Sequence, residues 1–333
     1  MSENTLELKN LTRTFRIGSM ILGTKITAVE DVNISLPGDK PWILSVVGES
    51  GSGKTTLARM LLGLQQPSSG EANLGGISLN ELRGAKRRKE FRRNVQPIFQ
   101  NPFSSFSARN RVDSYLFETA INFGMANNKK AAEPIVAEAL TSVGLTLSEI
   151  AGKYPNQFSG GELQRISIAR ALITRPSIII ADEPVAMIDA SLRMNIVNLF
   201  KKLKNEYNVS FVYITHDLST AYYVSDYIMI MYRGNMIEYG DARTILNHPM
   251  HPYTRLLLDS IPRVGEKWTT DMALPDMESK EYLLSGCKFS ARCAHAVQAC
   301  RTQKPCWTEM ENQKVYCTLP HNKPETLKED NEL

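Results

Sequence analysis

The segment at residues 48–55, which reads GESGSGKT, constrains the fold of this chain more than any other stretch. It lies between an apolar run at 42–47 and a helix-like run at 56–62. The spacing G-x-x-x-x-G-K-[ST] between a strand and a helix is that of a phosphate-binding loop, whose backbone N–H groups converge on phosphates at a helix N-terminus. A glycine- and serine-rich turn is the trivial alternative, but strand, loop and helix occur here in the required order. The sequence therefore predicts a site for a nucleoside triphosphate.

Two side chains of this loop are expected to meet the nucleotide and its metal ion. Lys54 would reach the β- and γ-phosphates, and the Thr55 hydroxyl would bind Mg²⁺. The other residues of this region that we expect at the nucleotide are Gly48, Ser50, Gly51, Gly53 and Thr56.

Length and composition describe a globular protein with one large domain and a smaller one, or two domains. The chain has 333 residues, 42% hydrophobic and 22% charged, with a net charge of +4. So small a charge indicates no nucleic-acid partner. No apolar run approaches the roughly 18 to 20 residues that span a bilayer, and the polar stretch 1–5 has no signal-peptide pattern. We therefore expect a cytoplasmic protein that reaches a membrane only through a partner.

The residues around the loop predict strands and a helical insertion. Alternation of apolar and polar residues at 6–11 and 26–36 predicts two half-buried strands. Phe15, between them, would stack on an adenine or pack in the core, and the residues alone leave both readings open. A basic run at 83–93 is typical of a solvated face. Gln100 follows a short apolar strand, and helical spacing after it predicts an insertion at about 101–170.

The segment 157–165, QFSGGELQR, predicts a helix with a capped start. Ser159 and Glu162 have the spacing of a capping box. Gly160 and Gly161, in the first turn, cost about 1 kcal/mol each relative to alanine. That cost is understandable if the backbone must approach a ligand, and a bare helix N-terminus is a good seat for a phosphate.

Two buried strands deliver polar side chains to the same edge of the sheet. The continuous apolar run at 177–181 is typical of a central parallel strand and ends in Asp182 and Glu183. Asp182 is expected to hold Mg²⁺ through water, and Glu183 to polarise the attacking water; an ordinary helix cap is the alternative. The strand at 209–215 ends in His216, which a parallel arrangement places on the same rim. Asp189 is expected to cap the next helix.

The chain changes character after a hairpin at 227–239 that is expected to turn at Gly234-Asn235. The first domain is expected to end near residue 240, which leaves a C-terminal extension at 241–333. All five cysteines lie between Cys287 and Cys317 in this extension, within the segment 286–320. In a reducing cytoplasm such a group more often holds a metal or a cluster than a disulfide framework.

Taken together, these motifs resemble the ATP-binding-cassette ATPases. The phosphate loop, Gln100, the segment 158–162, Asp182-Glu183 and His216 occur in the order seen in that family, and the Ser-Gly-Gly-Glu signature separates it from other phosphate-loop NTPases. The resemblance covers most of the chain, up to about residue 265. It implies an α/β fold with a mostly parallel core sheet, an N-terminal antiparallel part and the helical insertion.

The resemblance also implies a composite site, in which the signature helix of one cassette closes on ATP held by the phosphate loop of another. The implied roles are adenine stacking for Phe15, sensing of Mg²⁺ and water for Gln100, trans contacts to the γ-phosphate for Ser159 and Gly161, nucleotide contact for Gly160 and Asp189, general base for Glu183 and γ-phosphate switch for His216. The family usually has Ser-Ala-Leu-Asp after the glutamate. Here the segment reads Ala186-Met187-Ile188-Asp189, so the hydroxyl is lost, which favours a non-identical partner cassette.

The region after the cassette resembles the oligopeptide and dipeptide importer ATPases. The resemblance rests on residues 247–257 with Ile261-Pro262, and on 286–293 continuing to Cys317-Thr318-Leu319-Pro320. Members of that subfamily can hold a [4Fe–4S] cluster on four thiolates spaced C-x5-C-x6-C-x16-C, which here are Cys287, Cys293, Cys300 and Cys317. Zinc on four thiolates and metal-free packing stay open as alternatives. Cys306 is outside the pattern.

The function implied by the resemblance is an ATPase subunit that uses ATP and Mg²⁺ to power an importer of di- or oligopeptides. The implied partners are a second, non-identical cassette ATPase, two transmembrane permease subunits and, indirectly, an extracytoplasmic solute-binding protein; nucleic acid is not among them. The permeases would hold the chain peripherally at the cytoplasmic face of the plasma (inner) membrane. A nickel or oligosaccharide importer is the alternative with the same mechanism. A soluble cassette ATPase acting on nucleic acid or ribosomes is disfavoured, because this chain has one signature and no sustained heptads.

Overall fold

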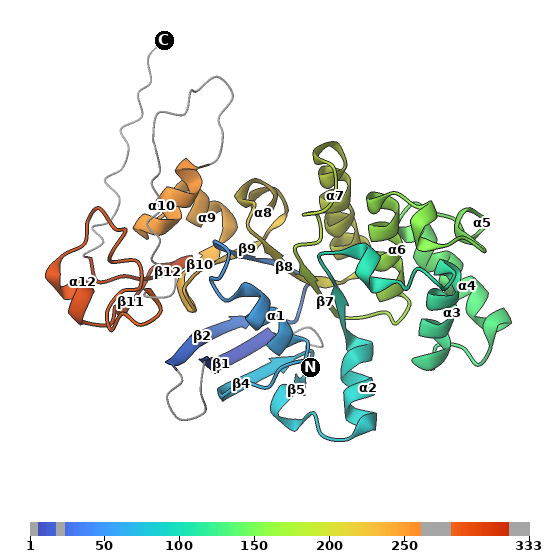
Figure 1. The fold of residues 1–333 in the computed structure, drawn as a ribbon, viewed down its shortest axis with the longest axis horizontal. Coiled ribbons are helices and arrows are strands. Elements are labelled where there is room, and N and C mark those ends of the chain that lie inside the picture. The colour runs from blue at the N-terminus through green and yellow to red at the C-terminus, as the bar shows by residue number, and fades with distance from the viewer. Residues whose placement is uncertain (1–5, 18–23, 261–280, 320–333) are drawn as a thin grey trace, which may run out of the picture.

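A single mixed sheet runs through the computed structural model, which describes residues 6–17, 24–260 and 281–319 (Figure 1). Within these residues the sheet has twelve strands, and its main path has the order β5-β4-β1-β2-β10-β9-β3-β8-β7-β6. Off this path, β12 pairs with β10 and β11 pairs with β12. The stretch 1–5, Ile261-Pro262 and Pro320, on which some expectations rested, lie outside the described residues.

Parallel strands form the core of the sheet, and each of them is a short apolar run in the sequence. They are β3 (Ile43–Val47), β6 (Val95–Ile98), β7 (Ile178–Asp182), β8 (Ser210–Thr215) and β9 (Tyr227–Tyr232). Every residue of β3 and β8 is buried, as strands covered on both faces must be. The register pairs Val47 with Thr215 and Asp182 with Ile214. The carboxyl ends of β3, β8 and β7 therefore meet at one edge.

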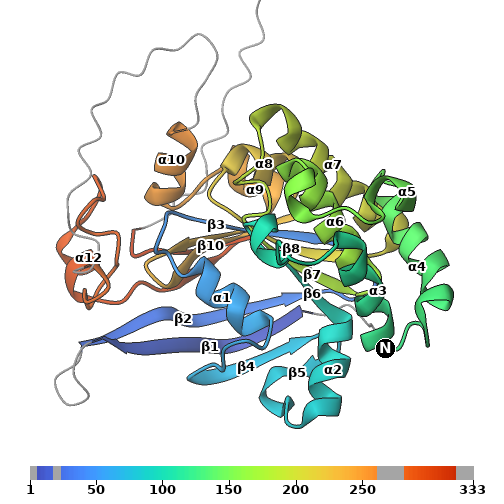
Figure 2. The same ribbon diagram turned by 45° about the vertical axis from the view of Figure 1, so that its right-hand side comes forward.

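Helices cover both faces of this core. They are α1 (Lys54–Leu61), α6 (Gly160–Leu172), α7 (Ala190–Tyr207) and α8 (Leu218–Val224). Successive strand residues point to opposite faces. Ile178 and Val212 accordingly belong to the core cluster that contains α1, whereas Ile179 and Phe211 belong to the one that contains α6 and α7. Figure 2 shows α1 between the core strands and the antiparallel layer.

The antiparallel layer is built from the N-terminal strands. They are β1 (Leu6–Ile17), β2 (Thr24–Leu36), β4 (Ser69–Leu74) and β5 (Ile77–Ser78). The two strands expected at 6–11 and 26–36 are confirmed, and β1 continues far enough to contain Phe15. A single parallel pair, Glu30 with Asn235, joins β2 to β10. The expected combination of an antiparallel part with a mostly parallel core is therefore correct.

The helical insertion forms a layer of its own beyond β6 and β7, at the right of Figure 1. It contains α3 (Val112–Asn122), α4 (Lys129–Ser142) and α5 (Leu147–Ile150), with short 3-10 helices at Pro102–Ser105 and Pro155–Gln157. Leu116, Val136 and Leu140 share a buried cluster with Leu163 of α6. The insertion therefore packs on the helix that carries the signature.

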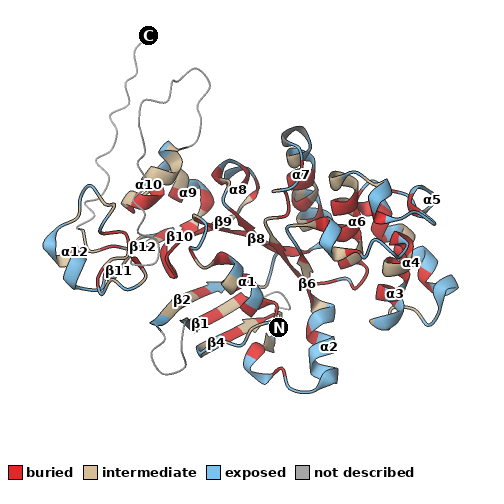
Figure 3. Ribbon diagram, in the orientation of Figure 1, coloured by how far each residue is buried: buried red, intermediate tan, exposed pale blue. Residues whose placement is uncertain are grey.

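The basic run forms helix α2 (Ala85–Asn94), after a 3-10 helix at Leu79–Glu81. Phe91 is its buried residue, and its basic residues are exposed (Figure 3). The expected solvated face is thereby confirmed.

The C-terminal part joins the sheet through β10, an interior strand, with which β12 also pairs. It comprises β10 (Asn235–Asp241), α9 (Ala242–Asn247), α10 (Pro252–Asp259), α12 (Gln298–Thr302), β11 (Trp307–Glu309) and β12 (Gln313–Tyr316). Strand β12 pairs antiparallel with β10, which places Val315 opposite Glu238. The ring centroids of Tyr232 and Tyr253 lie 4.6 Å apart, and that of Phe289 lies within 5.4 Å of both. In the described ranges, no helix is long and apolar enough to cross a bilayer.

Candidate functional site

The phosphate loop turns tightly between β3 and α1 and lies against two neighbouring strands. A Cβ at Gly48 would overlap the carbonyl oxygen of Met231, and one at Gly53 would overlap that of Ala28. Gly53 also has φ +107°, a conformation that L side chains rarely adopt. Glycine is therefore required at both positions, and the loop's shape is set by β2 and β9 as well as by its own sequence.

Lys54 is the cation of the loop and is buried, with 5% of its surface exposed. Its Nζ donates to the carbonyl oxygens of Gly48 and Glu49 at 2.7 Å and 2.9 Å. Burial lowers the pKa of Lys54, and the nearby carboxylates, Glu183 foremost, act in the opposite direction. An ammonium group seated on the loop's own carbonyls is ready to exchange them for phosphate oxygens. Thr55 and Thr56 follow in the first turn of α1, exposed and half-buried respectively.

Asp182 ends β7 beside the loop with an unsatisfied acceptor. Its Oδ1 is buried and has no hydrogen-bond partner within the described part of the chain. Burial, and then the charge of Glu183, raise the pKa of Asp182, while Lys54 lowers it. A buried oxygen without a donor fits a cation, and oxygen ligands are what Mg²⁺ prefers. The observation fits the expected Mg²⁺ role for Asp182, with Thr55 and Gln100 as the other expected contacts.

Three polar side chains converge after the ends of adjacent parallel strands. Gln100 Nε2, after β6, lies 3.1 Å from Glu183 Oε2, after β7. His216 Nδ1, after β8, lies 3.3 Å from Glu183 Oε1. The side chain of His216 is 61% exposed and that of Glu183 is 22% exposed, so the group opens to solvent. This is the arrangement that a carboxylate needs to orient a water molecule for attack on a phosphate.

The backbone of Glu183 is strained. Its φ is +46°, in the left-handed region, and its N–H donates to the carbonyl oxygen of Ile214 at 2.9 Å. A residue other than glycine in such a conformation costs on the order of 1–3 kcal/mol and is characteristic of functional positions. Glu183 adopts this conformation directly after β7, where its carboxylate contacts Gln100 and His216.

The signature helix α6 begins with the expected capping box. Ser159 N–H and Oγ donate to Glu162 Oε2 at 2.8 Å and 2.7 Å, and Glu162 N–H donates to Ser159 Oγ at 3.3 Å. These hydrogen bonds lower the pKa of Glu162. A Cβ at Gly160 or Gly161 would meet this chain only at ordinary distances of 3.4 Å and 3.5 Å. Packing within the chain therefore does not explain why glycines stand there.

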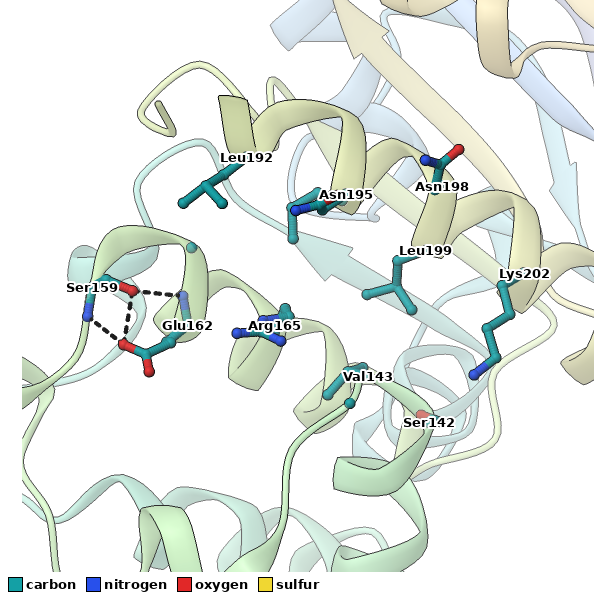
Figure 4. A pocket seen from close by; sticks show the side chains of 13 residues that line it. Ser142, Val143, Ser159, Glu162, Arg165, Leu192, Asn195, Asn198, Leu199 and Lys202 are labelled. Carbon is teal, nitrogen blue, oxygen red and sulfur yellow. Dashed lines mark hydrogen bonds between the residues drawn. The ribbon is translucent and has the colours of Figure 1, made fainter. Parts of the chain in front are cut away.

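The start of α6 opens onto a cavity of about 560 Å³ between α6, α7 and the end of α4 (Figure 4). Ser159, Gly161 and Glu162 line it on one side, and Leu192 and Asn195 of α7 on the other. Among the described residues, no member of the phosphate loop lines this cavity. The structure thus separates the signature from the chain's own phosphate loop.

Two further residues expected to contact the nucleotide are Phe15, which lies in β1, and Asp189, which lies at the start of α7. Phe15 is half-buried in β1, and the Arg13 guanidinium lies 4.8 Å from its ring centroid. It pairs with Ile26 of β2, two residues from Ala28, whose carbonyl oxygen lies against Gly53. Asp189 stands at the N-cap of α7, but its side chain makes no capping hydrogen bond to that helix.

The four patterned cysteines are free thiols that lie near one another. Burial raises the pKa of Cys287 to about 11, and the neighbouring Cys317, Cys300 and Cys293 act in the same direction. Cys306 is exposed. No three His, Cys, Asp or Glu side chains of the described segments are arranged to bind one metal ion. This arrangement supports neither the expected [4Fe–4S] cluster nor the zinc alternative. Four neighbouring free thiols remain a donor set that suits an iron–sulfur cluster.

The sequence reasoning missed the contacts between the C-terminal part and the phosphate loop. Arg292 forms an ion pair with Glu49, and Tyr253 accepts a hydrogen bond from the Glu49 N–H. Glu49 lies in the phosphate loop, and Tyr253 and Arg292 lie in the segments 247–257 and 286–293, all of which the sequence reveals as motifs. The pairing itself joins residues more than two hundred positions apart, which no local pattern encodes.

Comparison with known proteins identifies the chain. A family model described as "ABC transporter" matches residues 29–186, and one described as "Oligopeptide/dipeptide transporter, C-terminal region" matches residues 237–300. The chain is 37% identical over 310 residues to the oligopeptide transport ATP-binding protein AppF of Bacillus subtilis, an alignment covering 91% of this chain and 93% of AppF. The chain belongs to the ATP-binding-cassette family. The di/tripeptide transport ATP-binding protein DppF of Pseudomonas aeruginosa is 34% identical, with 95% of this cassette chain and 97% of DppF covered.

The fold agrees with this assignment. The cassette MJ0796, solved as a dimer in a post-hydrolysis state bound to ADP and Pi, has a TM-score of 0.62 and 28% identity. The match covers 72% of this chain and 99% of that cassette. Membership of the family makes this protein an ATPase, and the expected fold class is confirmed.

Proposed function

We propose that this cassette is the ATP-hydrolysing subunit that powers an importer of oligopeptides or dipeptides. The observation that carries the proposal is that one chain joins the nucleotide site to a C-terminal region matching the oligopeptide/dipeptide transporter model over residues 237–300. The curated relatives with the same extent are named as transport ATP-binding proteins for oligopeptides and di/tripeptides. The boundary between cassette and extension is proposed near residue 240.

In the proposed site, ATP lies on the loop with Lys54 at its β- and γ-phosphates and the adenine against Phe15. Mg²⁺ would be held at Thr55, Gln100 and Asp182. Glu183 would orient and deprotonate the attacking water, and His216 would contact the γ-phosphate. Glu183 is supported by its distances of 3.1 Å to Gln100 and 3.3 Å to His216.

A second cassette would complete the site. The signature residues Ser159, Gly160 and Gly161, with Asp189, would contact the nucleotide on the partner's phosphate loop. The separation of the signature cavity from this chain's own loop supports that reading. The loss of a hydroxyl at Ala186 supports a non-identical partner.

Two transmembrane permease subunits would hold the protein at the cytoplasmic face of the plasma (inner) membrane, and an extracytoplasmic solute-binding protein would act through them. The four thiols of Cys287, Cys293, Cys300 and Cys317 would bind a [4Fe–4S] cluster. That cluster would cross-link the C-terminal segment and so stabilise it, because the hydrophobic core of this segment is small.

Reconstitution with candidate partners tests the cargo. The chain is co-purified with the second cassette and permeases encoded beside it and placed in proteoliposomes with the matching solute-binding protein. ATP hydrolysis should rise several-fold when that protein is loaded with a di- or oligopeptide. Stimulation by nickel or by an oligosaccharide, but not by peptide, would replace the peptide cargo. Assembly without any stimulation would reject the transporter role.

A further inference from the structure

Residues of the β9–β10 turn and of the C-terminal part contact three consecutive residues of the phosphate loop from outside. Tyr253 Oη accepts from the Glu49 N–H at 2.9 Å. Arg233 Nη1 donates to the carbonyl oxygen of Ser50 at 3.3 Å, and Tyr282 Oη donates to that of Gly51. In a phosphate loop the N–H groups turn inward to the anion, so donors are needed outside for the carbonyls. Arg233 and Tyr282 supply such donors here, while Tyr253 accepts from the loop.

The strongest of these contacts is a two-point ion pair. Arg292 Nη1 donates to Glu49 Oε2 at 2.8 Å, and Arg292 Nη2 donates to Glu49 Oε1 at 2.9 Å. The side chain of Arg292 is 11% exposed and that of Glu49 is 30% exposed. The guanidinium lies 5.8 Å from the ring centroid of Tyr232 and 5.7 Å from that of Phe289. A bidentate pair with one partner packed on aromatic rings fixes direction as well as distance.

Glu49 belongs to the loop that binds the phosphates, so its negative charge opposes phosphate binding. Its carboxylate is close enough to Lys54 to affect that ammonium group, and Lys54 also donates to the Glu49 carbonyl. A phosphate that replaces this contact would bind at the residue whose side chain carries the negative charge. Like charges at short range in a partly buried site repel appreciably. Arg292 supplies the compensating charge.

We propose that Arg292 is a positioning residue for nucleotide binding. It acts through Glu49, chiefly by cancelling the carboxylate charge beside the phosphates, and to a smaller extent by holding the phosphate loop through the two-point contact. The ligand class is a nucleoside di- or triphosphate, whose anionic phosphates experience that charge. The C-terminal extension is thus a structural part of the nucleotide site in its own chain, whatever cargo the transporter moves.

The test measures binding of a fluorescent ATP analogue to the full-length chain in EDTA at low salt, so that no hydrolysis occurs. The variants are Arg292→Gln, Glu49→Gln and the double variant. Lys304→Gln is the matched control, because Lys304 Nζ pairs with Glu30 Oε1 at 2.6 Å and so joins the extension to β2 and not to a residue of the loop. A thermal melt of each variant records stability separately.

Arg292→Gln should weaken binding about tenfold, because it leaves the acidic side chain uncompensated. Adding Glu49→Gln should restore most of that loss, because the unfavourable charge is then gone. Added salt should narrow the difference between Arg292→Gln and wild type. Lys304→Gln should bind like wild type.

Wild-type binding by Arg292→Gln would overturn the proposal. So would a double variant as weak as Arg292→Gln, or an equal loss in Lys304→Gln, since either would mean that the extension merely supports the fold. Arg292→Lys keeps the charge and loses the fork, and it carries the test if Arg292→Gln does not fold. It should bind within about threefold of wild type, and a tenfold loss would contradict charge compensation.

Discussion

His216 Nδ1 lies 3.3 Å from Glu183 Oε1, although the two residues belong to different strands and are separated by more than thirty positions in the chain. The contact exists because β7 and β8 are parallel neighbours whose carboxyl ends meet at one edge. Gln100 reaches the other oxygen of the same carboxylate from β6. Glu183 is therefore held from both sides, in a backbone conformation with φ +46°.

Glu183→Gln should abolish most ATP hydrolysis while nucleotide binding persists. The amide keeps the size and the hydrogen-bonding reach of the side chain but cannot accept a proton from water, so a loss of at least about 10²-fold in turnover is expected. Phosphate release from the assembled transporter measures turnover, and a fluorescent nucleotide measures binding. Turnover at the wild-type rate would show that another group activates the water.

Lys54→Ala should weaken ATP binding by more than about tenfold, because it removes the buried cation that faces the phosphates. The variant also frees the carbonyl oxygens of Gly48 and Glu49, which now accept from Nζ at 2.7 Å and 2.9 Å. Equilibrium titration of the full-length chain measures the change. Lys86→Ala, on the exposed face of α2, is the control and should leave affinity unchanged.

Gly161→Ala should stabilise the folded chain and impair the assembled enzyme. A Cβ there meets Leu192 at an ordinary 3.5 Å, so alanine fits, and it favours a helix by up to about 1 kcal/mol over glycine. The proposed partner nucleotide would lose its close approach to the backbone. The expected result is a higher melting temperature with lower turnover and unchanged binding at the chain's own loop. Full turnover of the assembly would contradict the trans role.

Asp182→Asn should raise the stability of the nucleotide-free chain and remove Mg²⁺-dependent turnover. Burial raises the folded-state pKa of Asp182 above its unfolded value of 3.8. A raised carboxyl pKa contributes stability that is present below the unfolded pKa and lost as pH rises through the folded pKa. The advantage of asparagine should therefore grow as pH rises through that window. Chemical denaturation at a series of pH values measures it, and an advantage that shrinks with pH would refute the account.

Cys293→Ser should remove iron from protein purified without oxygen and lower the melting temperature of the C-terminal segment. Thiolates are the expected ligands, and a hydroxyl is a poor substitute. Cys306→Ser is the matched control, because Cys306 is exposed and outside the pattern. Iron and sulfide analysis provides the readout without any activity assay. Wild-type protein free of iron, or with stoichiometric zinc, would reject the cluster.

The motifs were readable from the sequence because each is local. The phosphate loop, the capping box at Ser159 and the acidic end of β7 depend on neighbours a few positions apart, where spacing alone dictates what backbone and side chains do. The apolar runs of β3, β7 and β8 likewise indicate strands that are buried on both faces. The basic residues of α2 were correctly predicted to be exposed, because charged side chains are seldom buried without partners.

The sequence by itself thus determined the core strands, the signature helix, the nucleotide loop and the family. Only the tertiary structure decided that Gln100 and His216 meet at Glu183, that no phosphate-loop residue lines the cavity at the signature, and that Arg292 reaches Glu49. Such contacts depend on sheet order and on packing between segments that lie from about thirty to more than two hundred positions apart in the chain. These contacts form only after the chain between the two partners has closed into a loop, so no local sequence pattern predicts them.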